Sequence, residues 1–128
     1  MVDWVCAAGC TLFMPSGSAD HLYVILNCPK DFLGLPPQSC ILVNFSTVRN
    51  APYDPTCIVQ SGSHSFINST SYIYYRHARI ETAMHLSSMV ANNYFNPHQP
   101  VNEGLLSSII AGLYASKFTP NFIKTLEI

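Results

Sequence analysis

Two short runs of β-branched and aromatic residues constrain the fold of this chain most strongly. They are HLYVILN at 21–27 and CILVNFSTV at 40–48, and segments rich in serine, glycine or proline surround them. Runs of this length and composition between turn-forming residues are typical of β-strands. Further strand segments are expected at 4–15, 57–60 and 71–81.

After Glu81 the spacing of apolar residues changes from a strand pattern to a helical one. Apolar residues recur with a period near 3.6, and small polar residues stand where helices would begin. A proline at the first helical position, as at Pro120, also favours a helix start. The expected helices cover 83–95, 103–118 and 121–128, and their expected N-cap residues are Thr82, Asn102 and Thr119.

Strands followed by helices predict an α+β protein. Five short strands joined by long loops close most easily into a small, bent antiparallel β-barrel. We therefore expect a single domain over 1–128, with a β-barrel at 1–81 and a helical C-terminal part at 82–128. The three C-terminal helices are expected to cover the open end of the barrel or to form a dimer face.

Charge content excludes several classes of protein. Charged residues make up 10% of the chain and the formal net charge is −1, whereas an average soluble domain has about 25% charged residues. So few charges indicate a surface partly covered by a partner subunit, and six basic residues exclude strong nonspecific nucleic-acid binding. The chain has no apolar run of about 18 residues and no basic segment typical of a signal peptide. These features predict a cytoplasmic protein with no membrane span.

The five cysteines have neither disulfide-scaffold spacing nor zinc-ligand spacing. We expect them to be buried free thiols. The sequence accordingly predicts neither a structural metal nor another cofactor.

The segment GSHSFINSTSYIYYRHARI (62–80) concentrates two histidines, three tyrosines and two arginines in a chain that is poor in charge. It is either a site for a polar, anionic substrate or an edge strand rich in tyrosine. If 71–81 is one strand, Arg76 and Arg79 lie on opposite faces by alternation, so only one of them points into a given cleft.

The order of these segments resembles that of the small barrels of the MazF/PemK toxin family. In that family a strand of the form RPALVLS precedes a strand that ends in a polar Ser/Thr cluster, and an arginine-containing return strand and helices follow. Residues 9–82 are similar in order, and His21 stands where the family has an arginine. The resemblance implies an SH3-like barrel of the MazF/PemK/CcdB type. It also implies a metal-independent endoribonuclease toxin of a toxin–antitoxin or related defence system, usually a homodimer.

Metal-free RNA cleavage gives the candidate residues their roles. The ribose 2′-OH attacks the adjacent phosphate with the help of a base, an acid and a cation. Histidine suits the first two roles because its ordinary pKa is about 6.5, and arginine suits the third through its planar guanidinium. His64 is the favoured histidine, because its loop is expected to be exposed and mobile. The catalytic candidates are His64, His21, Arg76 and Arg79.

Hydroxyl and aromatic side chains are the candidates for binding substrate. Hydroxyls match the polar cluster of the family and would contact phosphate, tyrosines would stack unpaired bases, and a flexible serine-rich loop would cover the site. These candidates also have structural alternatives. The hydroxyls could bond the local backbone, and the tyrosines could pack in the core. The two arginines proposed above for catalysis could instead pair with Glu81 or Asp54. The candidate substrate-binding residues are Ser46, Thr47, Tyr74, Tyr75 and Ser18.

Two other functions fit the same sequence. A non-catalytic module that binds a protein partner through an apolar surface is favoured by the low charge content. An immunity or antitoxin protein is the third alternative. The expected partners are therefore single-stranded RNA, a cognate antitoxin or another protein, and a second copy of the chain.

Overall fold

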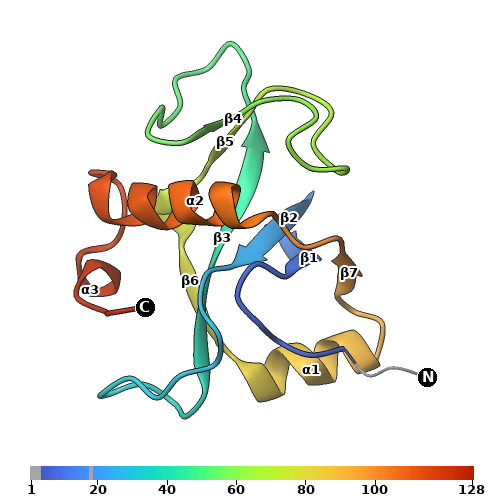
Figure 1. Cartoon of the computed structure of the whole chain (residues 1–128), viewed down its shortest axis with the longest axis vertical. Helices are drawn as coiled ribbons and strands as arrows, with labels where there is room; N and C mark the ends of the chain where they lie inside the picture. Colours follow the sequence, from blue (N-terminus) through green and yellow to red (C-terminus); the bar gives the residue numbers. More distant parts are fainter. Residues whose placement is uncertain (1–3, 18) are drawn as a thin grey trace.

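A computed structural model describes residues 4–17 and 19–128, and it confirms the predicted α+β class with three C-terminal helices (Figure 1). The strands are β1 (Thr11–Ser16), β2 (Ala19–Ile25), β3 (Ser39–Thr47), β4 (Ile58–Val59), β5 (Ser71–Ile73), β6 (Arg79–Thr82) and β7 (Asn96–His98). The helices are α1 (Ala83–Ala91), α2 (Glu103–Ala115) and α3 (Asn121–Lys124), and a 3-10 turn, η1 (Tyr75–His77), separates β5 from β6.

β3 is the longest strand and organises an antiparallel sheet. One edge of β3 pairs with β2, and the other edge pairs with β6 near its start and with β5 near its end. The sheet order is β4-β5-β3-β2-β1-β7, with β6 as a further partner of β3. Because β4 and β7 are the ends of this path, the sheet formed by the described residues is open. The predicted closed barrel is not confirmed.

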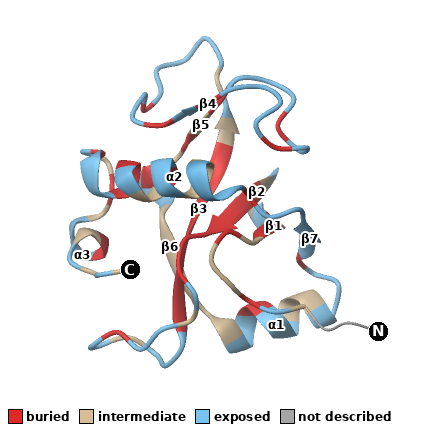
Figure 2. Cartoon of the chain, viewed as in Figure 1, coloured by how far each residue is buried: buried red, intermediate tan, exposed pale blue. Residues whose placement is uncertain are grey.

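Both faces of β2 and β3 are buried, because successive side chains of a strand point to opposite faces. One face packs against α2, whose Ile109 and Leu113 have no exposed surface, and the other packs against Leu86 of α1. Figure 2 shows this buried stretch along β2 and β3, with exposed loops around β4. Burial on two faces explains why both strands are almost continuously apolar in the sequence. The residues toward α2 are Leu22, Val24, Ile41 and Val43, and those toward α1 are Tyr23, Ile25, Cys40 and Leu42.

The predicted helix caps are confirmed for two helices of three. The side chains of Thr82 and Asn102 each accept a hydrogen bond from the backbone N–H three residues on, at 3.1 and 2.8 Å. The prediction for α3 is wrong, because Pro120 is its N-cap residue and the enclosed hydroxyl of Thr119 has no partner in the described part of the chain. No helix among residues 4–17 and 19–128 is both long enough and apolar enough to span a membrane.

The prediction of one strand over 71–81 is wrong, because η1 interrupts it. Tyr75 has no exposed surface, and its hydroxyl donates a hydrogen bond to the carbonyl of Ile109 in α2 at 2.7 Å. This contact turns the backbone away from the strand path before β6 begins. Alternation therefore does not decide where Arg76 and Arg79 lie.

β7 was not predicted, since NPHQP was expected only to end a helix. It pairs with β1 along the edge of the sheet, with Thr11 opposite His98 and Leu12 opposite Pro97. A proline is compatible with this position because an edge strand leaves one row of N–H groups unpaired. The short strand brings His98 and the following Gln99 beside the rest of the sheet.

The cysteines are free thiols, as predicted, but only three of them are buried. Cys6, Cys40 and Cys57 are buried, Cys10 is half-buried and Cys28 is exposed. The sulfur atoms of Cys6 and Cys40 lie 3.4 Å apart. The hydrogen bond between the two thiols lowers the pKa of Cys6 and raises the pKa of Cys40. Within the described ranges, no three His, Cys, Asp or Glu side chains converge to hold a metal ion.

Candidate functional site

The ladder between β2 and β3 ends early, and a cavity opens where it ends. The last pair is Tyr23 with Asn44. The next three residues of each strand would be opposite one another if the register continued, but they are not paired across the gap. All six line a cavity of about 330 Å³, the β2–β3 cavity. These residues are Asp20, His21 and Leu22 of β2 and Phe45, Ser46 and Thr47 of β3.

The loop between β4 and β5 forms the other wall of the β2–β3 cavity. It contributes Phe66, Ile67, Asn68 and Ser69, and Ser71 of β5 adds a further hydroxyl. Arg49 lies two residues beyond the end of β3, is exposed and lines the same cavity. The cavity therefore combines one imidazole, one guanidinium, the carboxylate of Asp20 and several neutral hydrogen-bonding groups.

His21 is the histidine of this cavity. The ring is half-buried, and its enclosed Nδ1 has no hydrogen-bond partner among the described residues. An enclosed polar atom without a partner costs about 1–3 kcal/mol, and such atoms are often found at sites that bind water or a ligand. Nδ1 of His21 is therefore available to form a hydrogen bond with a bound molecule.

Ser46 and Thr47 are the last two residues of β3, and both line the same cavity. Ser46 is half-buried and Thr47 is exposed. Neither hydroxyl makes a hydrogen bond within residues 4–17 and 19–128, so the alternative in which they bond the local backbone is not observed. Both remain available as donors to a ligand.

His64 does not line the cavity but holds its wall in place, so the prediction of an exposed, mobile histidine is wrong. Its ring is buried, and Nδ1 accepts a hydrogen bond from the backbone N–H of Phe66 at 3.0 Å. With Nδ1 accepting, Nε2 carries the proton and donates to the carbonyl of Gln99. His64 thus ties the loop after β4 to the segment after β7, and both ring nitrogens are committed to that role.

An aromatic cluster stands at the mouth of the β2–β3 cavity. The ring of Phe66 lies 5.2 Å from that of Phe13 and 4.8 Å from that of His98. Phe13 and Phe66 line the cavity, and Phe66 and His98 are exposed. Exposed, tilted rings beside a polar cavity are typical of sites that stack flat, unpaired groups such as bases.

A second, smaller hollow includes Tyr72 of β5 in its lining, and we call it the tyrosine cleft. Its volume is about 240 Å³. Ring centroids of Tyr53 and Tyr72 are 5.2 Å apart, those of Tyr72 and Tyr74 are 6.1 Å apart, and Tyr74 stacks on His77 at 4.5 Å. The lining residues are Pro52, Tyr53, Asp54, Tyr72, Tyr74, Arg76 and Phe118.

Asp54 is the buried carboxylate of the tyrosine cleft, and the protein satisfies it internally. It accepts hydrogen bonds from the hydroxyl of Ser116 at 2.6 Å and from the N–H and hydroxyl of Thr56 at 3.0 and 2.5 Å. Burial acts to raise the pKa of Asp54, but the bonds from Ser116 and Thr56 lower it more, so the pKa lies below its ordinary value. The carboxylate therefore stays charged without needing a cation from a ligand.

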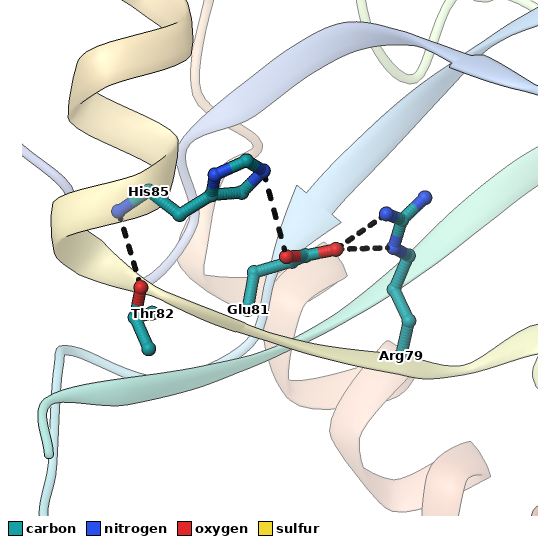
Figure 3. A network of polar contacts seen from close by, with 4 residues as sticks. All are labelled: Arg79, Glu81, Thr82 and His85. Carbon is teal, nitrogen blue, oxygen red and sulfur yellow. Dashed lines mark hydrogen bonds and ion pairs between the residues drawn. The ribbon is translucent and has the colours of Figure 1, made fainter. Parts of the chain in front are cut away.

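Arg79 belongs to a polar network with Glu81 and His85 (Figure 3), and it lines neither hollow. Its Nε donates to Glu81 at 2.8 Å, its second nitrogen also contacts Glu81, and the guanidinium lies 5.5 Å from the ring centre of Tyr23. The carboxylate of Glu81 is 3.9 Å from His85. Burial lowers the pKa of Arg79, but the bonds to Glu81 raise it more, so the net shift is upward. The ion pair with Glu81, considered as an alternative from the sequence, is confirmed for Arg79.

The structure thus divides the predicted site residues into separate groups. His21, Ser46 and Thr47 share the β2–β3 cavity, whereas Tyr74 and Arg76 line the tyrosine cleft. Tyr75 is buried in the core, where burial raises the pKa of its hydroxyl, and it has no exposed surface with which to contact a substrate. His64 and Arg79 make structural contacts instead. Ser18 lies outside the described residues.

Sequence reasoning missed Arg49 as a member of the site. The available signal was its position two residues beyond the Ser46–Thr47 cluster in a chain with only three arginines. Phe13, Phe66 and Asn68 carry no such signal, because their segments meet only in the folded sheet. This chain has no significant match to a protein-family model, a curated protein sequence or a solved structure.

Proposed function

We propose that the protein is a metal-independent endoribonuclease of the toxin type, acting on single-stranded RNA in the β2–β3 cavity. One observation carries this proposal: His21, Arg49, Ser46 and Thr47 line a single cavity where two strands separate. These side chains supply a proton-transfer group, a fixed positive charge and neutral donors. Cleavage of a phosphodiester by its own 2′-OH needs these three kinds of group.

In the proposed reaction, the imidazole of His21 takes the proton of the ribose 2′-OH as that oxygen attacks the adjacent phosphorus. The bond from phosphorus to the 5′-oxygen breaks as a solvent water gives the leaving oxygen a proton, and the hydroxide that remains takes the proton back from His21. The products are a 2′,3′-cyclic phosphate and a 5′-hydroxyl. Arg49 stabilises the negative charge on the phosphoryl oxygens, and the hydroxyls of Ser46 and Thr47 donate hydrogen bonds to them.

The same cavity suits a single strand better than a duplex. Phe13, Phe66 and His98 offer ring faces for an unpaired base, and base stacking on aromatic side chains is the usual way to hold single-stranded RNA. One arginine at the cavity also agrees with local, site-based binding, since strong nonspecific binding uses many basic contacts.

The proposal also covers the fold type of the protein and its partners. We relate the open sheet to the SH3-like barrel of the MazF/PemK/CcdB type, because β2, β3 and the β5–β6 segment occur in the order of that family. The low content of charged residues supports a homodimer and a cognate antitoxin that covers part of the surface. Both partners and the cytoplasmic location belong to this proposal.

A cleavage assay with purified protein tests the proposal. Labelled single-stranded RNA is incubated in a metal chelator with wild type, His21→Gln and Arg49→Ala. Loss of a proton-transfer group lowers rates by about 10²–10⁴-fold, and we expect a similar loss when Arg49 is removed. His85→Gln and Lys124→Ala are matched controls, because neither residue lines the cavity, and both should cleave like wild type.

Two results would contradict the proposal. Intact RNA with a folded wild-type protein would favour the non-catalytic binding module instead. Equal rates for wild type, His21→Gln and Arg49→Ala would place any ribonuclease activity outside the β2–β3 cavity.

A further inference from the structure

The tyrosine cleft presents a continuous row of rings on the protein surface. Tyr53, Tyr72, Tyr74 and His77 contact one another in that order, with centroid separations from 4.5 to 6.1 Å. Tyr53 is 40% exposed, and Tyr72 and Tyr74 are half-buried, so the row has ring surface that solvent reaches.

Arg76 supplies a positive charge to this row. It is exposed, lines the cleft and has no carboxylate partner within the described ranges. Its guanidinium lies 4.6 Å from the ring centre of Phe118, which also lines the cleft. Asp54 also lines the cleft, but its carboxylate is buried and accepts hydrogen bonds from Ser116 and Thr56, so the exposed charge of the cleft is that of Arg76.

The tyrosine cleft and the β2–β3 cavity are joined through one cross-strand pair. Tyr72 of β5 is directly opposite Ser46 of β3. Side chains of such a pair share one face of the sheet and have Cβ atoms about 5 Å apart. Ser46 lines the cavity and Tyr72 lines the cleft, so an extended ligand that leaves the cavity at Ser46 meets the tyrosine row next.

We propose that the tyrosine cleft is a second subsite for the same RNA strand: it stacks one unpaired base on the Tyr53–Tyr72 rings while Arg76 binds the phosphate beside it. The proposal rests on the proposed function, because the strand is the one held in the β2–β3 cavity. The cleft volume of about 240 Å³ suits one flat ring, since pockets for larger drug-sized ligands measure roughly 300–1,000 Å³. A base and its phosphate use both features of the cleft, the ring faces and the free guanidinium.

A binding assay with an uncleavable RNA tests this subsite separately from catalysis. The probe is a single-stranded RNA of about six nucleotides, methylated at every 2′-oxygen and carrying 2-aminopurine, whose fluorescence falls on stacking. We expect wild type to quench it, and Tyr53→Ala or Tyr72→Ala to weaken binding by about tenfold, the size of one lost stacking contact. Tyr72→Phe keeps the ring and should bind like wild type. Tyr94→Ala is the matched control, because Tyr94 is 66% exposed and lines neither hollow.

Arg76→Ala gives a second, independent measurement. Removing one phosphate contact from a single strand reduces the slope of log affinity against log salt by about 0.7, while Lys124→Ala should leave that slope unchanged. Both variants are checked for folding by circular dichroism, and Tyr53→Ala covers the case in which Tyr72→Ala does not fold.

The outcomes separate this inference from the proposed function. If the probe binds wild type, Tyr53→Ala and Tyr72→Ala equally, the subsite is overturned even where RNA is cleaved at His21. If binding depends on the tyrosines but no RNA is cleaved, the subsite stands as a nucleic-acid site and the endoribonuclease proposal fails. Absence of any quenching by folded wild-type protein overturns the subsite and makes a peptide the next ligand to examine.

Discussion

The packing of Tyr75 against α2 determines where the strand after β5 turns, and Gly112 makes that packing possible. A Cβ atom at position 112 would lie 2.1 Å from the hydroxyl oxygen of Tyr75 and 2.8 Å from Cζ of its ring. Ordinary carbon contacts are about 3.5–4.0 Å. Because Tyr75 has no exposed surface, its ring has no open space to move into. Gly112→Ala must therefore displace the ring or the helix.

The expected magnitude follows from three contributions. Overpacking a core of this kind costs about 1–3 kcal/mol. Breaking the hydrogen bond from Tyr75 to the carbonyl of Ile109 costs about 1–3 kcal/mol more. Alanine returns about 1 kcal/mol through its better helix propensity. We expect Gly112→Ala to lower the free energy of unfolding by about 3 kcal/mol.

Urea denaturation followed by circular dichroism measures this loss. Gly104→Ala is the control, because a Cβ at that position of α2 meets only Asn102, at an ordinary 3.5 Å, and should change stability by less than about 1 kcal/mol. Adding Tyr75→Phe removes the closest oxygen, so the double variant should lose less than the sum of the two single losses. Wild-type stability of Gly112→Ala would refute the reasoning, since Tyr75 would then not occupy the space beside α2.

Three further predictions concern buried polar groups. His64→Ala should lower the free energy of unfolding by about 1–3 kcal/mol in urea titrations; an unchanged midpoint would mean that its two ring bonds do not form. Ser116→Ala removes a hydrogen-bond donor to Asp54, whose pKa is lower in the folded than in the unfolded protein. The stabilisation that the charged Asp54 contributes is therefore present above the ordinary carboxyl pKa and is lost as pH falls through the folded pKa. We therefore expect the variant to be less stable at neutral pH and to approach wild type in acid, and an equal deficit at all pH values would contradict this. Treatment with a thiol oxidant should link Cys6 to Cys40, since their sulfurs need to approach by only about 1.4 Å to form a disulfide. Intact-mass analysis should show a loss of two hydrogen atoms, and Cys6→Ser should abolish that loss. Persistence of the loss in Cys6→Ser would exclude this pair.

The features of the fold that were predicted correctly depend on local sequence. The runs at 21–27 and 40–48 are apolar because both faces of β2 and β3 are buried, and that pattern is visible without any tertiary information. Thr82 and Asn102 cap helices through bonds only three residues long. The 3-10 turn was missed because its cause, the bond from Tyr75 to α2, joins residues 34 positions apart.

Part of the candidate site could also be predicted from local sequence, and the rest depends on contacts between distant segments. His21, Ser46 and Thr47 were selected from the order of the strands, and they share a cavity because each lies just beyond the last β2–β3 pair. His64 was expected to be exposed because its acceptor, Gln99, lies 35 residues later in the chain. Arg49 follows no periodic pattern, so only the folded structure brings it to the cavity.

The central claim is that the β2–β3 cavity cleaves RNA through its 2′-OH, and the chemistry of the product ends tests it most directly. Single-stranded RNA is incubated with wild-type protein or His21→Gln in a metal chelator, and the fragments are analysed by mass spectrometry. Our account predicts fragments with 2′,3′-cyclic phosphate and 5′-hydroxyl ends from wild type, and a loss of about 100-fold or more in their rate of formation with His21→Gln. Fragments that carry a 5′-phosphate, or cyclic-phosphate fragments that form at the wild-type rate with His21→Gln, would contradict it.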